Sequence, residues 1–135
     1  MNNSKVKLLL LTTLLLLALL TPTKAQSPEW HDVTVTVYNA TSSQTDSTPL
    51  ITADNSRIDT LKLRQGNLRW IAVSRDLLKK FPFGTMVYIW ISEGHPKNGS
   101  YFVHDSMGPR AINSIDILTY NERHGKWKAK IQKNP

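Results

Sequence analysis

The chain contains short segments in which apolar and polar residues alternate, and this pattern limits the fold more than any other feature. Residues 33–39, VTVTVYN, place three valines on one side and two threonines and a tyrosine on the other. Residues 126–131, KWKAKI, place Trp, Ala and Ile on one side and three lysines on the other. A period of two is typical of half-buried strands, so both segments are predicted to be strands.

Other segments extend this prediction to most of the chain. Further strands are predicted at residues 58–63, 68–73, 85–92, 101–103 and 112–118. Residues 75–80 predict a short helix capped by Ser74, residues 119–125 a turn or brief helix, and residues 40–56 a long polar loop. Six or seven short strands with one or two short helices predict a mainly β fold. We expect a small closed barrel, because closure removes the exposed edges of a sheet.

The N-terminal residues 1–25 have the composition of a secretory signal. Lys5 and Lys7 precede an apolar run at residues 8–20, and residues 23–25, TKA, resemble a cleavage site. The run is shorter than the roughly 20 residues of a membrane-spanning helix. The alternative is an uncleaved N-terminal anchor. We expect an exported protein, periplasmic or extracellular, without a membrane span after cleavage, with residues 26–32 leading into a domain at 33–132.

The composition limits the cellular compartment and the kinds of partner that suit this chain. The chain has no cysteine, which excludes disulfides and suits a bacterial envelope protein better than a small animal secreted domain. The formal net charge is +7, and removing the three lysines of the leader leaves +4. This mild excess suits an anionic polymer such as cell wall and is too weak and scattered to indicate nucleic acid. The four histidines lack metal-ligand spacing, so we expect no metal site. We expect a monomer.

Two aspartates lie in or beside predicted strands. Asp105 follows Tyr101–Val103, and Asp116 lies between Ile115 and Ile117. A carboxylate among β-branched residues is costly to bury unless it is paired. Each acid is therefore either a structural hydrogen-bond anchor or a group whose raised pKa serves chemistry. Two acids on neighbouring strands can converge on one cleft, as glycoside cleavage requires, but the spacing alone leaves both interpretations open.

Other polar and aromatic residues receive structural interpretations. His104, Asp105 and Ser106 are adjacent, and adjacent strand residues point to opposite faces, so a catalytic triad among them is not expected. The tryptophans at 70, 90 and 127 are predicted to lie in the core, although one of them can stack on a sugar ring. The lysines of residues 126–131 form either a solvated face or a contact with a polyanion.

Several ordered motifs resemble the three-aspartate (3D) domain family. They are Thr36–Tyr38, Thr45–Pro49 with Ile51–Ala53, Ile71–Val73, Phe83–Thr85 with Val87–Ile89, Asp105, and Ile115–Ile117. The family is similar to the catalytic barrel of membrane-bound lytic transglycosylase A. It implies a double-psi β-barrel, related to RlpA and expansins, over residues 33–132.

The resemblance also implies a function. Members cleave the β-1,4 bond between N-acetylmuramic acid and N-acetylglucosamine in peptidoglycan and leave a 1,6-anhydro product. Asp116 would be the single acid and base, Asp105 would tune it, and Tyr38, Asp46 and Thr52 would line the groove. No metal or cofactor is implied. The alternative is a non-catalytic barrel that binds peptidoglycan, as expansin-like modules do.

The sequence departs from the family pattern at two places. Ser74 occupies the position of the family's first aspartate, and the nearby Asp76 is explained as an acid in the first turn of a helix. The glycine-rich turn that follows the second aspartate is replaced by Ser106–Arg110. Arg110 is expected either to bind a substrate carboxylate or to pair with Asp105, which would lower the pKa of that acid.

Overall fold

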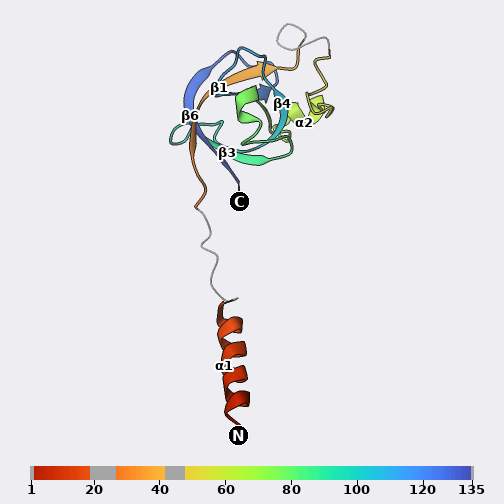
Figure 1. The fold of residues 1–135 in the computed structure, drawn as a ribbon. Helices are drawn as coiled ribbons and strands as arrows, with labels where there is room; N and C mark the ends of the chain where they lie inside the picture. The colour runs from red at the N-terminus through yellow and green to blue at the C-terminus, as the bar shows by residue number, and fades with distance from the viewer. Residues whose placement is uncertain (1, 19–26, 42–47, 135) are drawn as a thin grey trace.

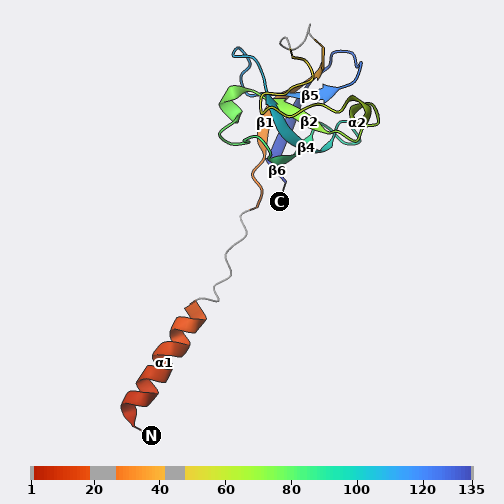
Figure 2. The same cartoon turned by 90° about the vertical axis from the view of Figure 1, so that its right-hand side faces the viewer.

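In the computed structural model, which describes residues 2–18, 27–41 and 48–134, six strands close into a barrel (Figures 1 and 2). The strands are β1 His31–Asn39, β2 Trp70–Val73, β3 Met86–Trp90, β4 Gly99–Ser106, β5 Ser114–Thr119 and β6 Lys126–Lys133. The short elements among them are α2, Thr60–Arg64, and the 3₁₀ helix η1, Arg75–Leu77. The prediction of a mainly β, small barrel with short helices is confirmed.

The order of the strands around the barrel differs from their order in the sequence. The order is β1-β5-β2-β4-β3-β6, and β6 closes the barrel against β1. Two neighbouring pairs, β1 with β5 and β2 with β4, are parallel, whereas the other four pairs are antiparallel. Parallel neighbours need crossover connections. These crossovers bring β1, β5, β2 and β4 side by side, although they are far apart in the sequence.

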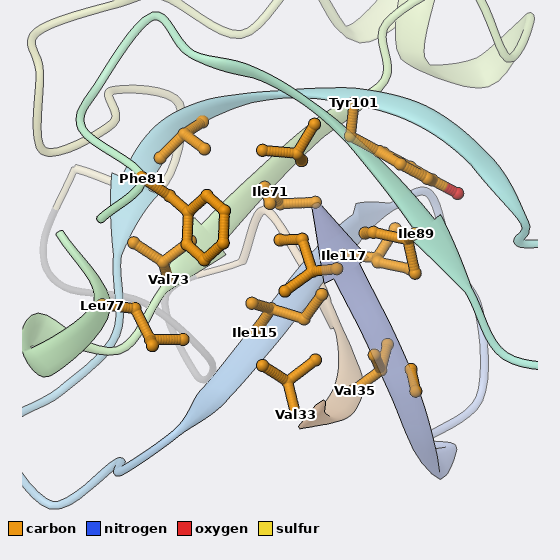
Figure 3. Packing of buried hydrophobic residues seen from close by; sticks show 14 of the residues in the cluster. Val33, Val35, Ile71, Val73, Leu77, Phe81, Ile89, Tyr101, Ile115 and Ile117 are labelled. Atoms are coloured by element: carbon orange, nitrogen blue, oxygen red, sulfur yellow. The ribbon is translucent and has the colours of Figure 1, made fainter. Parts of the chain in front are cut away.

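Alternate residues of the strands fill the interior of the barrel (Figure 3). Fully buried members include Val35, Ile71, Val87, Val103 and Ile115. β-branched side chains of this kind pack well on a pleated surface, and burying each one stabilises the fold by about 1.5–3 kcal/mol. The alternate residues of the same strands point outward and form the outer face of the barrel.

A second apolar cluster lies on the outside of the barrel wall. Tyr38, Ala72 and Leu118 come from three neighbouring strands, and Ile58 and Leu63 come from the crossover between β1 and β2. Because this crossover packs against outward-facing residues, it covers part of the wall formed by β1, β5 and β2. The polar side chains of Thr36 and Asp116 lie on the same outer wall, beside this apolar cluster.

Two local predictions are wrong. Residues 58–63 are not a strand, because Asp59 caps α2 by accepting a hydrogen bond from the Lys62 backbone N–H at 3.0 Å. The helix predicted at residues 75–80 is only the short η1, and the Ser74 hydroxyl does not cap it. That hydroxyl instead accepts a hydrogen bond from the Ser114 backbone N–H at 3.0 Å, which joins the end of β2 to the start of β5.

The three tryptophans predicted to be core differ in their surroundings. Trp70 and Trp127 are half-buried and pack against the outer and inner apolar clusters, respectively. Trp90 is 42% exposed, so the prediction is wrong for this residue. The physical reason is strand alternation, because Val87 and Ile89 take the inward positions of β3 and leave Trp90 outward.

The N-terminal helix α1, Asn3–Ala18, falls within the predicted leader. The predicted cleavage site at residues 23–25 lies outside the described residues, so cleavage stays a prediction. In the described part of the chain, no helix combines the length and the apolar character needed to cross a membrane.

The packing of the interior predicts a clear contrast between two isoleucines. Ile115→Ala removes a fully buried side chain and should lower the free energy of unfolding by about 2–5 kcal/mol. Ile112→Ala, at a residue that is 69% exposed, should change it by less than about 0.5 kcal/mol. Chemical denaturation of the two variants measures the difference, and equal effects would contradict the assigned core.

Candidate functional site

Two aspartates and their neighbours share one row across four strands of the barrel. In the strand register, Thr36 of β1 pairs with Asp116 of β5, Asp116 with Ala72 of β2, and Ala72 with Asp105 of β4. Neighbouring strands are about 4.8 Å apart, so the two acidic residues lie roughly 10 Å apart along the row. Both were predicted as site residues, and the fold brings them to the same outer face.

Asp105 reaches that face because β4 contains an irregularity. Val103 pairs with Ile71 and Asp105 pairs with the next residue, Ala72, so His104 is an extra residue in β4. Strict alternation would turn Asp105 inward with Val103, whereas a bulge of this kind redirects the side chains that follow it. The expectation that His104 and Asp105 occupy opposite faces is therefore wrong, since both lie on the outer side.

Asp116 is a half-buried carboxyl with one short hydrogen bond. Its Oδ1 accepts a hydrogen bond from the Thr36 hydroxyl at 2.6 Å. Burial raises the pKa of Asp116, and the nearby Asp105 carboxylate acts in the same direction. The Thr36 hydrogen bond and the proximity of His124 oppose the rise but do not cancel it. Asp116 therefore keeps its proton to a higher pH than an ordinary aspartate.

Asp105 has more hydrogen-bond donors around it. Its Oδ1 accepts from the backbone N–H groups of Ala53 and Ser106, each at 2.9 Å, and its Oδ2 accepts from the Tyr38 hydroxyl at 3.1 Å. Burial, followed by the charge of Asp105, raises the pKa of Tyr38, so the phenol keeps its proton and remains a donor. These three bonds fix the orientation of the Asp105 carboxylate.

Both acids line a groove of about 630 Å³ on the outer face. Tyr38 and Ala72 contribute to its strand side, residues of the 48–55 segment form one wall, and the 106–108 turn contributes to another. A concave space of this size with few convergent polar groups has the dimensions of a small-molecule or sugar site. The small side chain of Ala72 leaves room between the two carboxyl groups.

Thr52 lines the groove, as predicted, but its hydroxyl is occupied within its own loop. It donates to Asp54 Oδ1 at 2.6 Å and accepts from the Ser56 backbone N–H at 3.2 Å. Burial would raise the pKa of Asp54, but hydrogen bonds from Thr52, His104 and Ser56 outweigh it and lower that pKa. Thr52 therefore shapes the loop that supplies the Ala53 N–H, rather than offering a free hydroxyl.

The other predicted residues are Asp46, which lies outside the described residues, and Arg110, which the structure does not bring to the groove. Arg110 is exposed and is absent from the groove lining, and the ion pairs of the described residues do not join it to Asp105. Ser74 is fully buried between strand ends, and Asp76 accepts a hydrogen bond from the Asn113 backbone N–H at 3.0 Å. Neither therefore supplies a third acid to the groove.

Sequence reasoning missed several groups that line the groove or hold its acids. Arg75, which follows β2, lines the groove where Arg110 was expected to act. Met107 lines it from the altered turn, and Ala53 acts through its backbone N–H. The position of Arg75 two residues after the end of a predicted strand was a usable signal. A backbone donor such as the one from Ala53 leaves no signal in the side-chain sequence.

A serine, a histidine and an aspartate also meet beside the groove. His104 Nδ1 lies 2.6 Å from Asp54 Oδ2 and 3.2 Å from Ser56 Oγ. A nucleophilic triad needs the acid and the serine on opposite ring nitrogens, whereas here both contact Nδ1. The cluster therefore ties the loop to β4. Within the described residues, no group of acids and histidines is placed to hold a metal ion.

No family model matches the sequence, and no curated protein matches it. The site is therefore defined by its own geometry. It is an acidic groove on the outer wall of a six-stranded barrel, with one carboxylate fixed by three donors and one half-buried carboxyl whose pKa is raised by burial.

The Thr36 hydrogen bond predicts a measurable change in the titration of Asp116. Thr36→Val removes a donor to the carboxylate, so the pKa of Asp116 should rise further. The matched control is Thr34→Val, which changes an outward threonine two residues away in the same strand and should leave that pKa unchanged. Carboxyl NMR titration measures both, and an equal shift in the two variants would contradict the assigned bond.

The raised pKa of Asp116 also predicts the direction of a pH effect on stability. Because the folded state holds this proton more tightly than the unfolded state, stability should fall as the pH rises from the unfolded pKa through the folded one. Asp116→Asn removes that loss, so the variant should gain stability relative to the wild type over the same range. Denaturation from acid to neutral pH tests this, with the exposed Glu93→Gln as control; parallel curves for wild type and Asp116→Asn would refute it.

Proposed function

We propose that this protein is a peptidoglycan lytic transglycosylase, which cleaves the β-1,4 bond after N-acetylmuramic acid and forms a 1,6-anhydro product. One observation carries the proposal: Asp116 is a carboxyl with a raised pKa on the lining of an open groove. A general acid for glycoside cleavage must hold its proton near neutral pH and must reach the substrate. Burial raises the pKa of Asp116 in the direction that this role requires, and its place on the groove lining lets a bound ligand reach it.

The reaction needs one carboxyl group. Asp116 donates its proton to the glycosidic oxygen as the bond from C1 of N-acetylmuramic acid breaks, and the leaving sugar departs with a free C4 hydroxyl. The C6 hydroxyl oxygen of N-acetylmuramic acid then bonds to C1, and its proton passes to the Asp116 carboxylate. The acid is thereby regenerated, no water is consumed, and atoms and charges balance.

Asp105 serves this reaction through its charge. Negative charge near a carboxyl raises the pKa of that carboxyl, and Asp105 has this effect on Asp116. Its own orientation is fixed by Tyr38, Ala53 and Ser106. The motifs that resemble the 3D domain family supply Tyr38, Thr52, Asp105 and Asp116, and all four line the groove. This coincidence of motif and groove supports the proposal.

A non-catalytic barrel that binds peptidoglycan is the second candidate. It is favoured by Ser74, which is fully buried at the position of the family's first aspartate and makes structural hydrogen bonds. It is also favoured by the three hydrogen bonds to Asp105, which are typical of an anchor. This barrel would hold glycan in the same groove without cleaving it.

Digestion of purified sacculi separates the two functions. The wild type should release muropeptides with anhydro ends, and Asp116→Asn should reduce the rate by at least about 100-fold, because it removes the transferable proton. Glu93→Gln makes the same charge change at an exposed loop residue and should retain full activity. Borohydride treatment before chromatography distinguishes the products, since anhydro ends resist reduction and hydrolysed ends do not.

Each result has a defined meaning. Products with reducible ends would identify a hydrolase and refute the anhydro mechanism. Equal release by wild type and Asp116→Asn would remove Asp116 from catalysis. If the wild type releases no sugar while both proteins sediment with sacculi, the binding barrel is the correct function.

A further inference from the structure

The outer face of β6 carries a row of positive charge. Lys126, Lys128 and Lys130 are exposed and alternate with the inward-facing Trp127, Ala129 and Ile131. This confirms the predicted alternation of the segment. Residues two apart in a strand are about 7 Å apart, so the three ammonium groups form a linear array rather than a compact cluster.

These lysines have no ion-pair partners in the described part of the chain. The lysines that form ion pairs there are Lys62, Lys80 and Lys97. On the β1 side, Lys126 and Lys128 face the uncharged Thr36 and Thr34, and Lys130 faces Asp32 in the register without forming an ion pair. The charge of the row therefore remains available to a ligand.

An exposed indole lies next to this row. Trp90 of β3 is the register partner of Lys130 on the outer face, and its side chain is 42% exposed. Part of the Trp90 indole is therefore open to a ligand on the same face as Lys130. An indole face stacks on the apolar face of a sugar ring, and an adjacent ammonium pairs with an anionic substituent on that ring.

The strand register links the lysine row to the acidic groove. Lys126 is the register partner of Thr36, and the hydroxyl of Thr36 donates to Asp116. The row therefore begins next to Thr36, and Trp90 pairs with Lys130 farther along β6.

We propose that the lysines of β6 and Trp90 form a binding surface for an anionic glycan, with sugar rings stacked on Trp90 and carboxylate groups paired with the lysines. The ligand class follows from the lysines and the indole together. Lysines alone fit any polyanion, whereas an adjacent exposed indole suits a sugar ring. The inference rests on the proposed function for the source of the glycan, since muramic acid residues and their peptides carry carboxylates. It adds a surface outside the cleavage groove.

Sedimentation with purified sacculi tests this surface without requiring catalysis. In an Asp116→Asn background, Lys128→Gln with Lys130→Gln should weaken binding about three- to tenfold at low salt. Lys62→Gln with Lys79→Gln removes the same charge from exposed residues elsewhere and should have little effect. Raising the salt concentration should reduce the difference between the two pairs, because exposed charges are screened.

The contribution of Trp90 is tested with a soluble ligand pair. Trp90→Ala should weaken binding of soluble peptidoglycan strands at both low and high salt, because stacking is not screened. Neutral oligomers of β-1,4-linked N-acetylglucosamine should bind the wild type more weakly than peptidoglycan strands do. Their binding should not depend on Lys128 and Lys130.

Several outcomes would overturn the inference. These are equal losses for the two lysine pairs, no effect of Trp90→Ala, or binding of double-stranded DNA as strong as that of glycan at the same salt concentration. The result is also separable from the proposed function. Lysine-dependent binding without any cleavage would support the binding surface and refute the proposed enzyme. Cleavage by the wild type, with unaltered binding in the lysine variant, would support the enzyme and refute the binding surface.

Discussion

The extra residue His104 in β4 determines on which side of the barrel the acidic groove lies. Without it, Asp105 would point inward with Val103, into an interior made of apolar side chains where an ionised carboxylate is costly. With it, Asp105 joins Ala72, Asp116 and Thr36 in one outward row. The same irregularity leaves His104 outward, where it binds Asp54 and so holds the loop that donates the Ala53 N–H to Asp105. This one change of register thus turns Asp105 outward and also holds the loop whose Ala53 N–H orients the Asp105 carboxylate.

The two acids of the row differ in how fully their hydrogen-bonding capacity is used. Three donors contact the Asp105 carboxyl, whereas among the described residues Asp116 has the Thr36 hydroxyl as its short hydrogen-bond donor and is half-buried. Burial, with a smaller contribution from the charge of Asp105, raises the pKa of Asp116. Because the folded state holds this proton more tightly than the unfolded state, the arrangement reduces stability once the pH rises past the unfolded pKa of this residue.

The parts of the structure that follow from local alternation could be predicted from the sequence. The strands containing Val33 to Asn39 and Lys126 to Ile131, with their inward and outward faces, follow from a period of two. Asp105 and Asp116 are assigned to one site through the resemblance to the 3D domain family, because their spacing alone leaves a structural role open. The segment 58–63 could not be assigned correctly, since its apolar spacing also suits a strand and only the cap at Asp59 indicates a helix.

The β4 irregularity and the Ala53 N–H depend on pairing between distant segments, which local patterns do not encode. Arg75 replaced Arg110 at the groove for the same reason.

Barrel closure connects the proposed chemistry with the proposed glycan surface. Because β6 pairs with β1, the lysine row lies one strand away from Thr36 and two strands away from Asp116. An anionic chain bound along β6 would bring negative charge close to the groove, and negative charge raises the pKa of a nearby carboxyl. Burial and Asp105 already act on Asp116 in that direction, whereas Thr36 and His124 act against it. In the proposed mechanism, binding of the glycan would therefore raise the pKa of Asp116 further, in the direction that its role as general acid requires.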